Sequence, residues 1–368
     1  MIKYISQTNM EEFKDKRIIL RLDFNVPIKE GKITSDFRIQ KSKKTLDFLK
    51  ESGAKVIIIS HIKNIEGSTL YPVYDFLKKE YKISFVEDIY DGESIGRAIR
   101  ENNFILIENL RNWEGEKNND IEFSQYIASL GEIYINDAFS VSHREHASIV
   151  GVPSILPSYA GFQIENEIAS LNKVSKPEHP FSFILGGAKF ETKIPLIEKY
   201  GKGADLLYIG GAIANDVYKS RGYEIGKSLV GDIDIKEYIS GVDITVPEKV
   251  IVRGDDVRKT DIHSLESNEM ILDADPEALK DIRAQILESK TIIWNGPLGL
   301  YEGGFTEGTK ELAKLISKSD GYSVVGGGDT ISAIEDLGLL DEFSFISTGG
   351  GAMLQYLTDG SLVGIDAL

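Results

Sequence analysis

The segment SVVGGGDTISAIEDLG, residues 323–338, places three glycines and an acid between an apolar run and a helical pattern. Glycines where a strand meets a helix let backbone N–H groups approach a phosphate, and the helix N-terminus adds positive potential. Asp329 follows these glycines, where its carboxylate would repel a phosphate. Asp329 is either the N-cap of the helix or a ligand of a metal ion that lies between carboxylate and phosphate, and the two roles are compatible.

Arginine and histidine side chains gather in the expected loops of the first half of the chain: Arg21, Arg38, His61, Arg111, His143, Arg144 and His146. The net charge of the protein is −16. In an acidic protein, such a set is typical of a site that attracts a small anion. Scattered surface charge explains any single member, but it explains the whole set less well.

Strand-like and helix-like segments alternate from one end of the chain to the other. Runs such as KVIIIS (55–60) and TIIWNG (291–296) predict strands, and RIQKSKKTLDFLKESG (38–53) predicts a helix. This alternation predicts parallel sheets covered on both faces. The number of strands favours two doubly wound α/β domains over one sheet, although the pattern alone leaves a barrel open.

A break in this pattern predicts the boundary between the two domains at residues 150–180. GVPSILPSYAGF (151–162) holds two prolines, QIENEIASLNKV (163–174) has a helical pattern, and SKPEHP (175–180) is a second break. The helix between the breaks would therefore bridge two lobes. Residues 223–260 interrupt the alternation and predict a small β insertion.

The expected carboxyl ends of the strands carry two different sets of residues, and ligands of open parallel sheets bind at these ends. In the first half the ends carry polar groups: Asp23, Asn25, Ser60, His61, Glu108, Arg111, Asp137 and Arg144. In the second half they carry the glycine-rich stretches GGAK, GGAIAN, NGPLG, GGGDT and STGGGA. The first set suits a small anion, and the second suits a flat ring and phosphates. Two complementary sites suggest phosphoryl transfer between two bound molecules.

The stretch GGAKFETK, residues 186–193, follows a predicted strand and opens a predicted helix. Lys189 and Lys193 are four residues apart, so the pattern predicts that both lie on one helix face. Either lysine could instead belong to a solvated helix surface.

Composition narrows the classes of function. The chain has 368 residues, enough for two domains, and no cysteine, which excludes thiolate metal sites and cysteine nucleophiles. Its acidity disfavours nucleic acid as a partner. No apolar run approaches the roughly 20 residues that a membrane span needs. The N-terminus MIKYISQTNMEEF lacks the apolar core of a signal peptide, so we expect a cytoplasmic protein.

Eight stretches, in order along essentially the whole chain, resemble the phosphoglycerate kinase family. They are RLDFNVPIKEGKITSDFRI, ENLR…GEKNND, INDAFSVSHREHAS, LGGAKFETKI, GYEIGKSL, WNGPLGLYE…F…GT, GGGDT and STGGGAMLQYL. One stretch alone is modest evidence, but eight in the right order are highly specific. The resemblance implies a monomeric phosphotransferase with a carboxyl group as acceptor. It would transfer phosphate reversibly from 1,3-bisphosphoglycerate to ADP, with Mg²⁺, giving 3-phosphoglycerate and ATP in glycolysis and gluconeogenesis.

The resemblance also implies a fold, which is two Rossmann-like parallel-sheet domains joined by a hinge helix. The N-terminal domain, 1–160 with a C-terminal tail of about 355–368, would bind phosphoglycerate. Residues 161–174 would form the interdomain helix, and 175–354 the nucleotide-binding domain.

The resemblance assigns site residues position by position. Phosphoglycerate would be held by Asp23, Asn25, Arg38, His61, Arg111 and Arg144. The nucleotide would be held by Lys193, Asn295, Glu302 through its ribose, and the turn Gly327, Gly328, Asp329 and Thr330, with Gly187, Gly210 and Gly211 lining the adenine pocket. Arg38, Lys189 and the backbone N–H groups of Gly349 and Gly350 would stabilise the transferring phosphoryl group. Asp329 would coordinate the magnesium ion.

The chain departs from the family pattern at SHIKNI, residues 60–65, where the family usually has Ser-His-Leu-Gly-Arg-Pro. Asn64 stands in place of an arginine that would contact phosphoglycerate, and Lys63 lies beside it, so both belong to the expected substrate site. Two alternatives follow, namely a degenerate nucleotide-binding relative with weakened or lost kinase activity, and a non-catalytic two-lobed protein that binds an anion.

Overall fold

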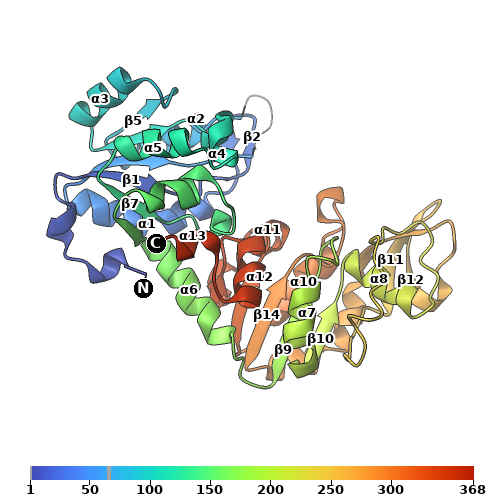
Figure 1. The fold of residues 1–368 in the computed structure, drawn as a ribbon. Helices are drawn as coiled ribbons and strands as arrows, with labels where there is room; N and C mark the ends of the chain where they lie inside the picture. The colour runs from blue at the N-terminus through green and yellow to red at the C-terminus, as the bar shows by residue number, and fades with distance from the viewer. Residues whose placement is uncertain (1, 64–67) are drawn as a thin grey trace. The chain divides into compact units, whose positions relative to one another are not determined.

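The structure is a computed structural model that describes residues 2–63 and 68–368. The chain forms two compact units, and Figure 1 shows the path of the chain through both. The first unit holds the residues up to Ala169 together with Ser361–Leu368, and the second holds Ser170–Gly360. The division falls within helix α6 (Phe162–Val174), which continues from one unit into the other.

The first unit is built on a six-stranded parallel sheet. The strand order is β5 (Ile83–Val86), β6 (Phe104–Ile107), β4 (Lys55–Ile59), β1 (Arg17–Arg21), β7 (Ile133–Asn136) and β8 (Ser158–Ala160). Its helices are α1 (Phe37–Glu51), α2 (Tyr71–Leu77), α3 (Gly92–Glu101), α4 (Glu114–Lys117), α5 (Ile121–Ser129) and α13 (Val363–Asp366). A short hairpin of β2 (Ile28–Lys29) and β3 (Lys32–Ile33) precedes α1.

The central strands of this sheet are apolar on both faces. In β1, Ile18 and Leu20 belong to one hydrophobic core, and Ile19 belongs to a second. Successive strand residues point to opposite faces. The unbroken apolar runs of the sequence are therefore explained by a sheet with a core on each side, as doubly wound folds require.

The C-terminal residues belong to the first unit. The N–H group of Gly364 in α13 donates to the carbonyl of Ser142 at 2.8 Å. A β-carbon on Gly364 would lie 2.4 Å from the side chain of Ile149, so the segment packs too closely for a larger residue.

The second unit has a five-stranded parallel sheet. The strand order is β10 (Leu206–Ile209), β9 (Phe181–Leu185), β14 (Thr291–Asn295), β15 (Tyr322–Gly326) and β16 (Phe345–Ile346). Its helices are α7 (Ile194–Tyr200), α8 (Ile213–Ser220), α9 (Arg283–Glu288), α10 (Glu307–Ile316), α11 (Gly328–Asp336) and α12 (Gly350–Asp359). Together with the first unit, this sheet confirms the predicted α/β class with two Rossmann-like parallel sheets.

The β insertion lies later in the chain than the sequence predicts. Three antiparallel strands, β12 (Val257–Asp261), β11 (Lys249–Arg253) and β13 (Met270–Ala274), form a separate small sheet. Residues 223–248 contain turns instead, such as those closed by Ser228 N–H to Ile225 and Tyr238 N–H to Ile235. Strand β8 lies in the segment 151–162, which was expected to be a break. It is a strand because its backbone pairs in parallel with β7.

Candidate active site

Loops at the carboxyl ends of β1, β4, β6 and β7 bring polar side chains of the first unit together. The carboxylate of Asp23, just after β1, receives a 2.8 Å ion-pair contact from Nη1 of Arg38 in α1. The same Arg38 nitrogen donates to the carbonyl of Asn25 at 3.2 Å. Three residues expected at the substrate site, Asp23, Asn25 and Arg38, are thus adjacent, and Arg38 is oriented by two acceptors.

Positive charge exceeds negative charge around this cluster. Burial, followed by the neighbouring Arg144 and Arg21, lowers the pKa of the Arg111 guanidinium to about 10, although Glu116 and Asp23 act in the opposite direction. Arg111, in the turn after β6, and Arg144, after β7, therefore lie close enough to repel each other. A set of guanidiniums that outnumbers the nearby carboxylates favours a bound anion.

The loop after β4 carries His61 and Lys63. His61 is 1% exposed, and its Nε2 lies 4.0 Å from the Asp23 carboxylate. The backbone N–H of Lys63 donates to the side-chain oxygen of Asn25 at 2.8 Å, while the Lys63 side chain is exposed. The expectation for Asn64 lies outside the described residues.

In the second unit, polar groups converge on the glycine turn after β15. Lys193 is buried and donates to Oδ1 of Asn295 at 2.5 Å. The Asn295 Nδ2 and the Thr330 hydroxyl, both buried, have no hydrogen-bond partner in the described part of the chain. Both groups face Gly327, since a β-carbon there would lie 3.9 Å from Asn295 Nδ2 and 3.3 Å from Thr330 Oγ1.

Gly327 is the N-cap of α11 and has φ of +112°, a conformation that favours glycine. Asp329 lies in the first turn of α11 and makes no side-chain cap. The alternative that Asp329 caps this helix is therefore wrong, because the helix begins at Gly328, before the aspartate. Gly350, the first residue of α12, packs against Gly327, since its β-carbon would lie 2.9 Å from the Gly327 Cα.

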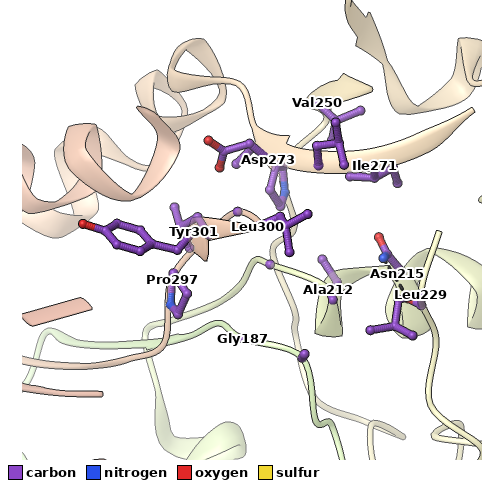
Figure 2. Close-up of a pocket in the computed structure, with 18 of the residues that line it drawn as sticks. Gly187, Ala212, Asn215, Leu229, Val250, Ile271, Asp273, Pro297, Leu300 and Tyr301 are labelled. Atoms are coloured by element: carbon purple, nitrogen blue, oxygen red, sulfur yellow. Dashed lines mark hydrogen bonds between the residues drawn. The ribbon is translucent and has the colours of Figure 1, made fainter. Parts of the chain in front are cut away.

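A cavity of about 380 Å³ lies beside this turn. Figure 2 shows Gly187, Ala212, Pro297 and Leu300 around it, with Val250 and Ile271 of the small sheet on another side. Glu302 and Asp329 also line the cavity. A mainly apolar cavity with acids at its edge suits a flat ring joined to a polar chain.

Close backbone contacts build the glycine side of this cavity. The N–H of Gly187 donates to the carbonyl of Pro297 at 2.9 Å, and that of Gly211 donates to Leu298 at 3.1 Å. A β-carbon on Gly210 would lie 2.5 Å from the Leu298 side chain. The expected adenine-pocket glycines thus form one surface with the loop after β14.

A sequence profile of phosphoglycerate kinase matches residues 8–360. The chain belongs to the phosphoglycerate kinase family. The phosphoglycerate kinase of Dictyoglomus turgidum is 39% identical over 391 residues, which cover 100% of this chain and 98% of the relative. That of Coprothermobacter proteolyticus is 38% identical over 381 residues, 97% of each chain.

Solved structures of phosphoglycerate kinases have the same fold. The enzyme from Pyrococcus horikoshii OT3 has a TM-score of 0.86 at 29% identity, and the one from Coxiella burnetii has 0.81 at 34% identity. Each comparison covers 100% of this chain and 98% of the solved one. The family is a phosphotransferase family of glycolysis, and none of these findings favours the degenerate alternative.

The family's use of ATP and ADP implies a magnesium ion, and the residues present fit one. Burial and the negative charge of the nearby Glu302 raise the pKa of Asp329. A bound cation would offset this repulsion between the two carboxylates. The described residues contain no cluster of three acids or histidines suited to hold a metal. Mg²⁺ in kinases is commonly bound through one or two carboxylates and the substrate phosphates, and Asp329 offers such a carboxylate.

The prediction that Lys189 and Lys193, after β9, share one helix face is wrong. Helix α7 begins only at Ile194, so Lys193 is its N-cap and Lys189 lies in the preceding turns. Pro195 explains this start, because proline is tolerated in the first turn of a helix but not in its interior. Lys189 is exposed whereas Lys193 is buried.

The two backbone N–H groups expected to stabilise the phosphoryl group, at the start of α12, differ in their hydrogen bonding. The N–H of Gly349 donates to the Ser347 hydroxyl at 3.2 Å. The N–H of Gly350 lies at the first position of α12, where no acceptor within the helix exists.

Sequence reasoning missed Glu116 and Asp273, and it misplaced Arg21. Arg21 was grouped with the anion-binding arginines, but it ends β1, is completely buried, and lies 3.9 Å from the equally buried Glu116. Asp273 is buried at the cavity wall, where burial raises its carboxyl pKa to about 7. The position of Arg21 at the end of a strand buried on both faces could have indicated that it is buried, but nothing in the sequence pairs it with Glu116, 95 positions away.

The helices of the described residues give no candidate for a membrane span, because none combines the required length and apolarity.

Proposed function

We propose that the protein transfers a phosphoryl group reversibly from 1,3-bisphosphoglycerate to ADP, giving 3-phosphoglycerate and ATP. The first unit would hold the phosphoglycerate and the second the nucleotide. The observation that carries this proposal is the set of unused buried donors, Asn295 Nδ2 and Thr330 Oγ1, beside buried Lys193 at the glycine turn. Buried donors without acceptors are costly, and phosphate oxygens would satisfy them.

The phosphoglycerate site would use the arginine cluster. Arg38, Arg111 and Arg144 would bind its phosphate and carboxyl groups through paired N–H donors. Asp23 and Asn25 orient Arg38 through the contacts described above and would receive the substrate hydroxyl. The backbone N–H of Lys63 donates to the side chain of Asn25, so the Lys63 backbone lies at the edge of this cluster. Its exposed side chain would contribute a positive charge there.

The nucleotide site would use the cavity and the glycine turn. The adenine would lie against Gly187, Gly210 and Gly211, and the ribose would bond to Glu302. Lys193, Asn295 and the residues Gly327, Gly328 and Thr330 would bind the phosphates. A magnesium ion on Asp329 would neutralise phosphate charge.

In the transfer step, a β-phosphate oxygen of ADP forms a bond to phosphorus, and the bond from phosphorus to the carboxyl oxygen of 3-phosphoglycerate breaks. No proton moves. Such a reaction depends mainly on positioning and on stabilising negative charge. Arg38, Lys189 and the N–H groups of Gly349 and Gly350 would supply that stabilisation, with Gly349 exchanging its Ser347 acceptor for the phosphoryl oxygen.

A coupled assay with 3-phosphoglycerate and MgATP tests this function. We expect turnover in the parent, and a loss of about a hundredfold in Arg38→Ala and in Lys189→Ala, the usual effect of removing one charge-stabilising group. Lys202→Ala, at an exposed lysine of the same unit, is the control and should keep parental turnover. Nucleotide binding without turnover in the parent would instead support the degenerate alternative.

We also propose that the protein acts in the cytoplasm as a monomer, which its family resemblance supports. Light scattering at micromolar concentration tests the second part, and a mass of twice 40.8 kDa would contradict it.

A further inference from the structure

We propose that Arg21 is a positioning residue that holds His61 as the neutral tautomer with its proton on Nε2. His61 then serves the acidic substrate as a hydrogen-bond donor and not as a cation. This inference rests on the proposed function for its substrate, whereas the tautomer itself can be measured without activity.

The contacts of Arg21 leave its guanidinium no freedom to move. The side chain is 0% exposed. Its Nε donates to the Ser148 hydroxyl at 2.9 Å, and its Nη1 donates to the carbonyl of Leu22 at 2.7 Å. The third nitrogen, Nη2, lies 3.2 Å from Nδ1 of His61.

The chemistry of the two groups decides the tautomer. A guanidinium has N–H donors and no acceptor, and arginine stays protonated in proteins. Nδ1 of His61 must therefore accept this hydrogen bond with its lone pair. An imidazole whose Nδ1 is an acceptor is neutral and carries its one proton on Nε2.

Charges on the surrounding elements reinforce the neutral state. Arg21 in β1, Arg111 after β6, Arg38 in α1 and Arg144 after β7 all disfavour a charged His61, and burial is the largest cause that lowers its pKa well below the usual value. The opposing groups are Asp23, at 4.0 Å from Nε2, and Glu116, at 3.9 Å from Arg21. Two carboxylates stand against four guanidiniums, so the net field opposes protonation.

Asp23 does not accept a hydrogen bond from Nε2 of His61. Its Oδ1 accepts the N–H of Asn25 at 3.0 Å. Its Oδ2 accepts from Arg38 and from the hydroxyl of Ser140. At 4.0 Å, Nε2 is beyond hydrogen-bond distance, so this donor remains available beside the proposed phosphoglycerate groups.

Glu116 supplies the counter-charge that a buried arginine needs. Its carboxylate, also 0% exposed, lies 3.9 Å from Arg21. It accepts the N–H and the hydroxyl of Ser148 at 2.9 and 2.7 Å. Glu116 thus balances the charge of Arg21, and Ser148, which Glu116 holds, fixes the Arg21 side chain. Arg21 acts on the substrate only through His61.

Nitrogen-15 NMR of the histidine-labelled full chain tests the tautomer directly. In the parent we expect His61 to show an unprotonated Nδ1 and a protonated Nε2, unchanged from pH 5.5 to 8. A protonated Nδ1, or titration of His61 near pH 6.5, would overturn the inference.

Variants test the role of Arg21 in binding. Arg21→Met with Glu116→Gln removes both buried charges together, so that neither is left unpaired. With the Nη2 donor to Nδ1 gone, we expect His61 to populate the tautomer protonated at Nδ1 in this variant and the KM for 3-phosphoglycerate to rise more than kcat falls. A folded variant in which His61 keeps its proton on Nε2 alone, or in which KM is unchanged although the Nδ1 tautomer is populated, would refute the positioning role.

Substitutions of His61 itself keep the test decisive if that variant does not fold. The amide N–H of glutamine can reach the place of Nε2, whereas that of asparagine reaches the place of Nδ1. We expect His61→Gln to keep KM within about fivefold of the parent and His61→Asn to raise it by about tenfold or more, the loss expected for a hydrogen bond to a charged group. The reverse order would contradict the Nε2 donor. Absence of turnover with the expected NMR tautomer would refute the proposed function and leave the tautomer established.

Discussion

At the scale of single residues, the structure separates two lysines that the sequence treats alike. Burial lowers the pKa of Lys193 to about 8, while Lys189 lies exposed in the preceding turn. Lys193 has an amide oxygen as its hydrogen-bond partner, so a phosphate would be a much stronger acceptor for it. The free protein therefore holds this proton less firmly than the nucleotide complex would.

We predict that ADP affinity falls as pH rises above about 8. Below pH 8 the free Lys193 already carries its proton, whereas above pH 8 binding must first take one up, at a cost of up to about tenfold per pH unit. Titration calorimetry in two buffers of different ionisation enthalpy should detect proton uptake at pH 8.5. Lys193→Arg should bind without this uptake, and equal proton uptake by the variant and the parent would contradict the assignment.

A second residue-scale prediction concerns the metal. Asp329→Asn removes the carboxylate but keeps the size of the side chain, so turnover should fall by about a hundredfold with little loss of fold. The affinity for ADP should lose most of its dependence on Mg²⁺, as measured with and without a chelator. Asp341→Asn, at an exposed acid of the same unit, is the control, and an unchanged Mg²⁺ dependence in Asp329→Asn would exclude the assigned role.

At the scale of elements, the second unit depends on the approach of three loops. Gly211, after β10, has φ of +63°, and a β-carbon on it would lie 2.7 Å from both the Gly187 nitrogen and the Pro297 oxygen. These neighbours are backbone atoms, which cannot rotate away as a side chain can. The loops after β9, β10 and β14 are therefore fixed to one another at a residue that must be glycine.

We predict that Gly211→Ala destabilises the second unit by about 1–3 kcal/mol, since strained backbone conformations have costs of this size. The KM for nucleotide should rise, because the displaced loops line the cavity, while the KM for 3-phosphoglycerate should change little. Urea unfolding and steady-state kinetics provide the measurements. Gly203→Ala is the matched control, because a β-carbon at Gly203 meets no atom within 4 Å and its φ is not positive, and equal effects of the two variants would contradict the argument.

At the scale of the whole molecule, the protein is acidic, but each compact unit presents a region that suits an anion. The first unit does so with guanidiniums and the second with a buried lysine, amides and a helix N-terminus. We predict that each substrate protects its own unit from amide hydrogen exchange. MgADP should slow exchange around residues 186–193 and 295–330, and 3-phosphoglycerate should slow it around residues 20–40 and 108–113. Protection by both ligands in the same unit would disprove the division of labour.

The sequence by itself determined the α/β class, most strands, and the residues at their carboxyl ends. These depend on local patterns, namely apolar runs, helical spacing and glycine after a strand, which the chain carries wherever it folds. Asp23, Asn295 and the 327–330 turn could be predicted as site residues because ligands of parallel sheets lie at such ends, whereas the role of Arg38 was predicted from the family resemblance.

The tertiary structure alone decided burial and pairing. It buried Lys193 and exposed Lys189, enclosed Arg21 with Glu116, and made Gly327, not Asp329, the N-cap of α11. Desolvation and charge pairing depend on residues distant in sequence, and these set a pKa, a tautomer and an available donor. The sequence thus indicates which groups take part, and the packing within each unit determines the charge that each group bears.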